Sequence, residues 1–127
     1  MSEMTLNAGV RRLIVGALTT VPHLEALLLL RAQPRAWGDE EVAGRLYVSR
    51  DRAAAVLADL ESSGLLTRAS NGYAYGPADA ETARLVADLA DAYARHVVEI
   101  TRLIHSRTDR AAQQFADAFL IRKGDRP

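Results

Sequence analysis

Arginines in two neighbouring segments are the side chains of this sequence best suited to bind a ligand. Arg50 and Arg52 follow Ser49 at the start of a helical pattern, and Arg68 stands three residues before an Asn-Gly pair. An arginine can donate two parallel hydrogen bonds to a phosphate or to the edge of a base, and a serine hydroxyl can donate one to a phosphate. Residues of these types could therefore bind an anion such as a phosphate, and arginine is not a residue type that itself breaks bonds.

Residues typical of catalysis or metal binding do not gather in the sequence. The chain has no cysteine, which excludes disulfides, thiol nucleophiles and thiolate metal sites. Its histidines, His23, His96 and His105, lie on different segments or nine residues apart on one helical pattern, so they do not form a set of metal ligands. No nucleophile with a plausible base appears, and the glycines lack the spacing of a phosphate-binding loop. We expect a protein that is not an enzyme and carries no cofactor and no metal.

Length and composition limit the class of protein. The 127 residues suffice for one domain with a helical extension, and 49% hydrophobic with 25% charged residues is near the average for a globular protein. The longest apolar run is far shorter than the roughly 18 residues that a membrane span needs, and the N-terminus lacks the pattern of a signal peptide. We therefore expect a cytoplasmic protein with no membrane partner.

The charge balance argues against a strongly basic surface. Sixteen basic residues oppose sixteen acidic ones, and residues 22–77 contain six arginines against seven acids. Proteins that bind double-stranded DNA usually carry a basic excess, because contacts to phosphates supply much of their affinity. Any contact with DNA would therefore depend on a few arginines, with Asp51 and Asp59 opposing it.

Apolar spacing and capping residues predict four helices before residue 64. Apolar residues at spacings of three and four predict the first helix within residues 1–20. Thr20 suits the N-cap of a second helix, and Gly38 that of a short third helix. Ser49 caps a fourth helix that ends at Gly64, where a left-handed residue is typical.

A β-hairpin follows the fourth helix. Its first strand begins at residue 65, and Asn71-Gly72 predicts a two-residue type I′ turn, since both residues tolerate the positive φ that this turn requires. Such a turn would place Arg68 opposite Tyr75, where the guanidinium could stack on the ring.

The helix and hairpin at residues 49–77 resemble part of a known DNA-binding fold. The sequence SRDRAAAVLADLESSGLL at residues 49–66 is similar to the recognition helix and first wing strand of MarR-like bacterial transcriptional regulators, and residues 22–77 resemble a winged helix-turn-helix domain. The resemblance implies that the helix enters the major groove of DNA and that the wing approaches the minor groove. The DNA-contacting residues that it implies are Ser49, Arg50, Arg52, Ala54 and Ala55 on the helix and Arg68, Asn71 and Gly72 on the wing.

One long helical pattern runs from about residue 79 to residue 105. At 1.5 Å per residue it would span roughly 40 Å, which is longer than a small domain needs. Part of its apolar stripe would then be uncovered, and we expect a second copy of the chain to cover it. The residues expected to form this dimer interface are Leu85, Leu89, Tyr93, Val97, Ile100 and Ile104.

The predicted fold is mainly α-helical with a small two-stranded β-wing. Its parts are an N-terminal helical arm (1–20), a winged helix-turn-helix domain (21–77), a long C-terminal dimerisation helix (78–106), and a short terminal helix with a tail (107–127). The resemblance implies a sequence-specific DNA-binding transcriptional regulator that acts as a homodimer. The alternative is a winged-helix module that binds another protein and binds DNA little or not at all, because Ala54, Ala55 and Ala58 form a smooth face that a partner could approach closely.

Two aromatic groups have uses that the sequence leaves open. Family members often bind small ligands between the dimer helices and the winged domain, and Trp37, Tyr47 and Tyr93 could line such a cleft. Phe115 and Phe119 on the terminal helix either pack on the core or form a docking surface for a second subunit or partner protein.

Overall fold

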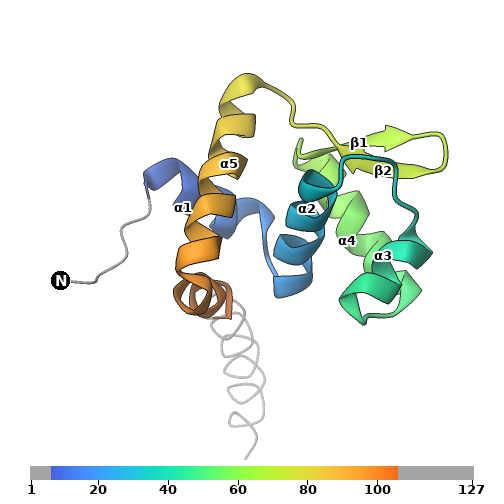
Figure 1. Cartoon of the computed structure of the whole chain (residues 1–127), viewed down its shortest axis with the longest axis horizontal. Helices are drawn as coiled ribbons and strands as arrows, with labels where there is room; N and C mark the ends of the chain where they lie inside the picture. The colour runs from blue at the N-terminus through green and yellow to red at the C-terminus, as the bar shows by residue number, and fades with distance from the viewer. Residues whose placement is uncertain (1–6, 106–127) are drawn as a thin grey trace, which may run out of the picture.

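The computed structural model describes residues 7–105 as helices accompanied by one two-stranded antiparallel sheet (Figure 1). Its elements are α1 (Ala8–Ala17), α2 (Val21–Ala32), α3 (Asp39–Leu46), α4 (Arg50–Ser62), β1 (Leu66–Ala69), β2 (Gly72–Tyr75) and α5 (Ala80–Arg95), followed by helical residues 97–105. The predicted class, mainly helical with a small hairpin, is confirmed. The expected terminal helix with Phe115 and Phe119 lies outside the described residues.

Capping groups set several helix boundaries where the sequence predicted them. The Thr20 side chain accepts a hydrogen bond from the His23 backbone N–H and begins α2. Ser49 Oγ accepts one of 3.1 Å from the Arg52 backbone N–H and begins α4. Gly64 follows α4 with a φ of +79°, the left-handed conformation expected at a helix end. These signals act within about one helical turn, which is why the sequence alone reveals them.

The core forms where α2, α3 and α4 pack together. Residues at helical spacing on α4 are buried against α2 and α3, namely Ala53, Val56, Leu57 and Leu60. Full burial of one large aliphatic side chain contributes roughly 1.5–3 kcal/mol, so this face holds the third helix in place. The helix that ends at Gly64 therefore packs as the third member of a three-helix core and leads directly into the hairpin, as the sequence predicts.

A second layer of helices covers α2 from the other side. α1 and α5 pack against each other and lie on the side of α2 away from α3 and α4 (Figure 1). Gly9 permits a close approach, because a Cβ there would lie 2.6 Å from Leu85 Cδ2. Among the described residues no single helix is long and apolar enough to cross a membrane, and α1 and α2 reach that length and apolarity only as a pair bent by 114°.

The hairpin has a different register from the predicted one. β1 pairs with β2 so that Arg68 lies opposite Tyr73, and the loop consists of residues 70–71. Neither loop residue has the positive φ that a type I′ turn needs. The predicted turn at residues 71–72 and the pairing of Arg68 with Tyr75 are therefore wrong.

The reason for this register lies outside the hairpin, at Trp37. The Trp37 backbone N–H donates to Tyr73 O at 2.7 Å, and the Tyr73 N–H donates to Trp37 O at 2.9 Å. Gly72 has a φ of +151°, and a Cβ at this position would lie 2.0 Å from the Trp37 carbonyl oxygen. Gly72 is therefore needed to let two backbones approach each other rather than to turn the chain.

The predicted long C-terminal helix is interrupted. α5 ends at Arg95, His96 has φ −134° and ψ 50°, and the helix resumes over residues 97–105. Figure 1 shows the chain changing direction at the lower end of α5. The segment after this bend buries Ile100 and Ile104 in the hydrophobic core. Burial of these two isoleucines stabilises the bent arrangement and offsets the helical hydrogen bonds that the break removes.

The bent chain buries much of the stripe expected to form a dimer interface. The buried members are Leu89, Ile100 and Ile104, and the half-buried ones are Leu85 and Tyr93. Val97, with 44% of its surface accessible, is the one exposed member of the six. Leu89, Ile100 and Ile104 are therefore buried within a single chain and are not available to the expected dimer interface.

Candidate functional site

A cleft between α4 and the hairpin brings together three segments that are distant in the sequence. It has a volume of about 400 Å³ and is lined by Gly38, Asp39, Ala54 and residues 68–73. Four of the predicted contact residues line it, namely Ala54, Arg68, Asn71 and Gly72. The others, Ser49, Arg50, Arg52 and Ala55, lie on or at the start of α4.

Arg50 and Arg52 occupy the first turn of α4 in different electrostatic settings. Arg50 Nε lies 3.4 Å from Asp39 Oδ2, an ion pair between the starts of α4 and α3. Arg52 is exposed and has no ion pair with any residue in the described range 7–105. An anion at the start of α4 would therefore find Arg52 without an ion-pair partner, although Asp51 lies next to it, whereas it would compete with Asp39 for Arg50.

Arg68 is held in place on the surface of the hairpin. Its Nη1 donates a hydrogen bond of 2.8 Å to the Tyr73 hydroxyl oxygen, and its guanidinium carbon lies 5.0 Å from the centre of the Tyr73 ring. Both side chains line the cleft. The cross-strand pair thus fixes one cation at the cleft, and the guanidinium keeps further N–H donors for a ligand.

The start of α3 on the other side of the cleft is braced by a cluster around Trp37. Arg35 donates to both carboxylate oxygens of Glu41, at 3.2 and 3.1 Å, and its guanidinium lies 3.7 Å from the Trp37 ring centre. The Gly38 N–H also donates to Glu41, at 3.3 Å. The Arg35 hydrogen bonds, with that of Gly38, hold the pKa of Glu41 below its usual value of 4.5. These contacts fix the loop to which the hairpin is attached.

Asp59, which the sequence suggests would repel phosphates, has a structural partner in His23. His23 is 5% exposed, and its Nε2 lies 2.9 Å from Asp59 Oδ2 while its Nδ1 lies 2.6 Å from Thr20 Oγ1. A neutral imidazole satisfies both contacts, donating from Nε2 and accepting the Thr20 hydroxyl proton at Nδ1. The pair joins α2 to α4 across 36 residues of sequence. Sequence reasoning missed it, since no local pattern connects the two residues.

The alanine-rich face of α4 is partly available. Ala55 and Ala58 are exposed, whereas Ala54 is half-buried in the cleft. Between the arginines at the start of α4 and Asp59 near its end, this face therefore carries alanines, which have no side-chain hydrogen-bonding groups.

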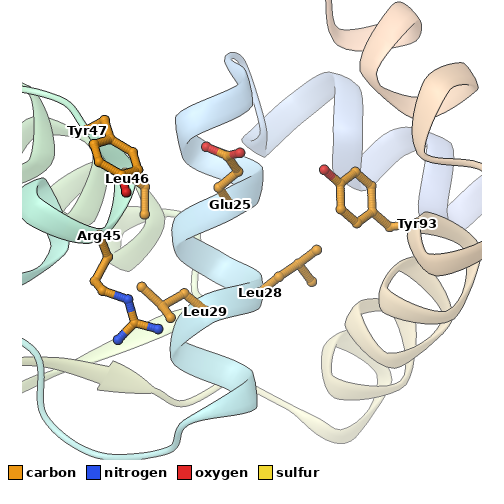
Figure 2. A pocket seen from close by; sticks show the side chains of 7 residues that line it. All are labelled: Glu25, Leu28, Leu29, Arg45, Leu46, Tyr47 and Tyr93. Atoms are coloured by element: carbon orange, nitrogen blue, oxygen red, sulfur yellow. The ribbon is translucent and has the colours of Figure 1, made fainter.

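A groove lies along α2, outside the cleft between α4 and the hairpin, and we call it the α2 groove. It has a volume of about 460 Å³ and is lined by Glu25, Leu28, Leu29, Arg45, Leu46, Tyr47 and Tyr93. Figure 2 shows α2 between residues 45–47 on one side and Tyr93 on the other. Two of the three aromatics expected to line a ligand cleft, Tyr47 and Tyr93, do line one hollow. The third, Trp37, does not, because it is buried in the core.

Neither a metal site in the described part of the chain nor a known relative assigns a further role to these surfaces. Within residues 7–105, no three histidine, aspartate or glutamate side chains converge to hold a metal ion. Comparisons with protein-family models, with curated proteins and with solved structures find no match for this chain.

Proposed function

We propose that this chain is a winged helix-turn-helix DNA-binding protein that acts as a homodimeric transcriptional regulator, with α4 as the recognition helix and the hairpin as the wing. The observation that carries the proposal is the cleft shared by α4 and the hairpin tip, where Ala54 and Arg68 lie with Asn71. A helix and an adjoining hairpin can contact a groove and the neighbouring phosphates of one duplex at the same time.

The chemistry assigns different tasks to the arginines. Arg52, exposed and without an ion pair within the described range, would bind a phosphate or a base edge from the start of α4. Arg68, fixed against Tyr73, would position the wing on the backbone. Arg50 would have to exchange its contact with Asp39 for one with DNA. A dimer would present these arginines twice, so the affinity for DNA would come from these local cations rather than from the net charge of the domain.

The test begins with selection of bound fragments from genomic DNA. Binding of a selected fragment is then titrated by fluorescence anisotropy at several salt concentrations, with wild type, Arg52→Ala and Arg84→Ala. Arg84 is an exposed arginine of α5 outside the cleft, so this control removes the same charge. We expect Arg52→Ala to weaken binding and to reduce the slope of log Kd against log salt by about one for each phosphate that the protein no longer binds, with Arg84→Ala close to wild type. A wild-type protein without salt-dependent affinity for any fragment contradicts the proposal.

A protein-binding module is the second candidate, and the exposed Ala55 and Ala58 on α4 favour it together with the balance of charge. Replacement Ala55→Arg separates the two functions. The added cation would strengthen binding of DNA at α4 but would obstruct a protein that packs closely on this face.

A further inference from the structure

We propose that the α2 groove is a self-association surface, in which the Tyr47 ring of one copy enters the groove of a second copy across a two-fold axis. The inference rests on the homodimer in the proposed function and names its surface. It does not depend on DNA binding, because Glu25, Arg45 and Tyr47 lie outside the cleft between α4 and the hairpin.

Tyr47 is the first observation that points to a partner. Its side chain is 94% exposed, the largest exposure among the large hydrophobic side chains of the described residues. Its backbone has φ 59° and ψ 45°, and it is the one residue other than glycine with a positive φ between residues 7 and 105. A bulky residue in this conformation is strained, and strain that a fold retains at the surface points to a function for the side chain.

The groove beside Tyr47 supplies the complementary shape. Leu28, Leu29 and Leu46 give it apolar walls, and Tyr93 closes the side formed by α5 (Figure 2). A projecting ring next to an apolar hollow on the same molecule is the arrangement that a two-fold axis makes self-complementary, because each ring can fill the other copy's hollow. Aromatic residues inserted into such hollows are typical anchors of protein interfaces.

The charges of the groove favour a second copy over other occupants. Glu25 and Arg45 are both exposed, and neither forms an ion pair with another described residue. Arg45 is held at its end of the groove by the Trp37 ring, whose centre lies 5.3 Å from the guanidinium carbon. A two-fold axis through the groove would set Glu25 of each copy against Arg45 of the other. Tyr47 is almost wholly exposed to solvent, so its ring is free to contact a second copy.

The proposed surface would place the dimer interface apart from most of the stripe that the sequence predicts. The sequence predicts an interface along α5 and residues 97–105. Three of its six residues, Leu89, Ile100 and Ile104, are buried in the core of a single chain. The α2 groove uses Tyr93 from the same stripe, together with residues from α2 and from the end of α3.

A charge-exchange experiment with the full chain tests the proposal. Sedimentation velocity over a range of micromolar concentrations would compare wild type, Glu25→Arg, Arg45→Glu and an equimolar mixture of the two variants. We expect the wild type to dimerise and each single variant to dissociate at least about tenfold more readily, because each pair of opposite charges becomes a pair of like charges. The mixture should dimerise again, since each exchanged residue then faces its opposite. Circular dichroism of every variant checks that the fold is retained.

A second variant separates interface from fold. Tyr47→Asn keeps a residue that tolerates the left-handed conformation but removes the ring, so it should raise the melting temperature of the monomer while weakening the dimer. A wild type that is monomeric throughout the range overturns the proposal, whatever its affinity for DNA. So does a wild-type dimer that the exchanged charges leave intact, which would mean that another surface holds the two copies. If the variants dissociate and re-associate as expected but the wild type does not bind DNA, the result contradicts only the proposed DNA-binding function.

Discussion

Replacement of Gly72 by alanine should detach the hairpin from the loop before α3. An alanine Cβ would lie 2.0 Å from the carbonyl oxygen of Trp37 and 2.5 Å from its carbonyl carbon, and backbone atoms cannot move aside as a flexible side chain can. The φ of +151° adds strain, since this region is occupied readily only by glycine. The chain can accept the methyl group only by separating the two backbones.

The loss of stability in Gly72→Ala can be calculated from the hydrogen bonds that are broken when the two backbones separate. Two hydrogen bonds join Trp37 and Tyr73, at 2.7 and 2.9 Å, and each contributes about 0.5–1.5 kcal/mol. Backbone strain at residue 72 costs about 1–3 kcal/mol where it is not relieved. We expect a total loss of about 2–6 kcal/mol in the free energy of unfolding, a large fraction of the roughly 5–15 kcal/mol of a typical domain. The melting temperature should fall by about 10 °C or more.

Thermal denaturation followed by circular dichroism measures this loss, and tryptophan fluorescence reports its location. Trp37 is the only tryptophan of the chain and is buried, so detachment of the hairpin should shift its emission to longer wavelength before the helices unfold. Gly44→Ala is the matched control: no atom lies within 4 Å of a Cβ there, so alanine should stabilise α3 by about 0.5–1 kcal/mol. A Gly72→Ala protein that melts with the wild type and keeps its emission spectrum would refute the reasoning that this close approach fixes the hairpin.

Three further predictions concern single side chains. Tyr47→Asn should increase the free energy of unfolding by about 1 kcal/mol in urea titrations of the monomer, because it relieves left-handed strain at an exposed position. Asp59→Ala should destabilise the fold by about 1 kcal/mol, since it removes the partner of the buried His23, whereas Asp59→Asn keeps an acceptor, should melt near the wild type and should bind DNA more tightly. The lowered pKa of Glu41 means that its bond to Arg35 stabilises the fold above the usual carboxyl pKa and is lost as the pH falls through the lowered value. Urea titrations across the acid range should therefore show a shallower loss of stability for Glu41→Gln than for wild type, and equal slopes would contradict the assignment.

The sequence predicts those parts of the fold that local interactions determine. Thr20, Ser49 and Gly64 mark helix ends through groups no more than about one turn away, and the apolar spacing of α4 identifies its buried face. These signals are sufficient to place the three-helix core and the hairpin after it. The residues of α4 and the hairpin that line the cleft follow from this order of elements.

The errors arise where a distant contact overrides a local preference. An Asn-Gly pair favours a tight turn, but the bridge from Trp37 to Tyr73 fixes the register and uses Gly72 for a close approach. The helical pattern continues through His96, but burial of residues 100 and 104 bends the chain there. The bond between His23 and Asp59 belongs to the same class, because 36 residues separate its partners.

Trp37 connects the two surfaces that the proposals assign to different partners. Its backbone bonds to Tyr73 hold the hairpin at the cleft, and its ring lies under Arg45, which lines the α2 groove. Arg35 packs on the same ring at 3.7 Å and braces the start of α3 through Glu41. An ion pair between Arg45 and a partner would therefore form beside the residue whose backbone holds the hairpin. Trp37 therefore supports both surfaces from inside the fold, since it lines neither hollow but contacts Arg45 of the groove and Tyr73 of the cleft.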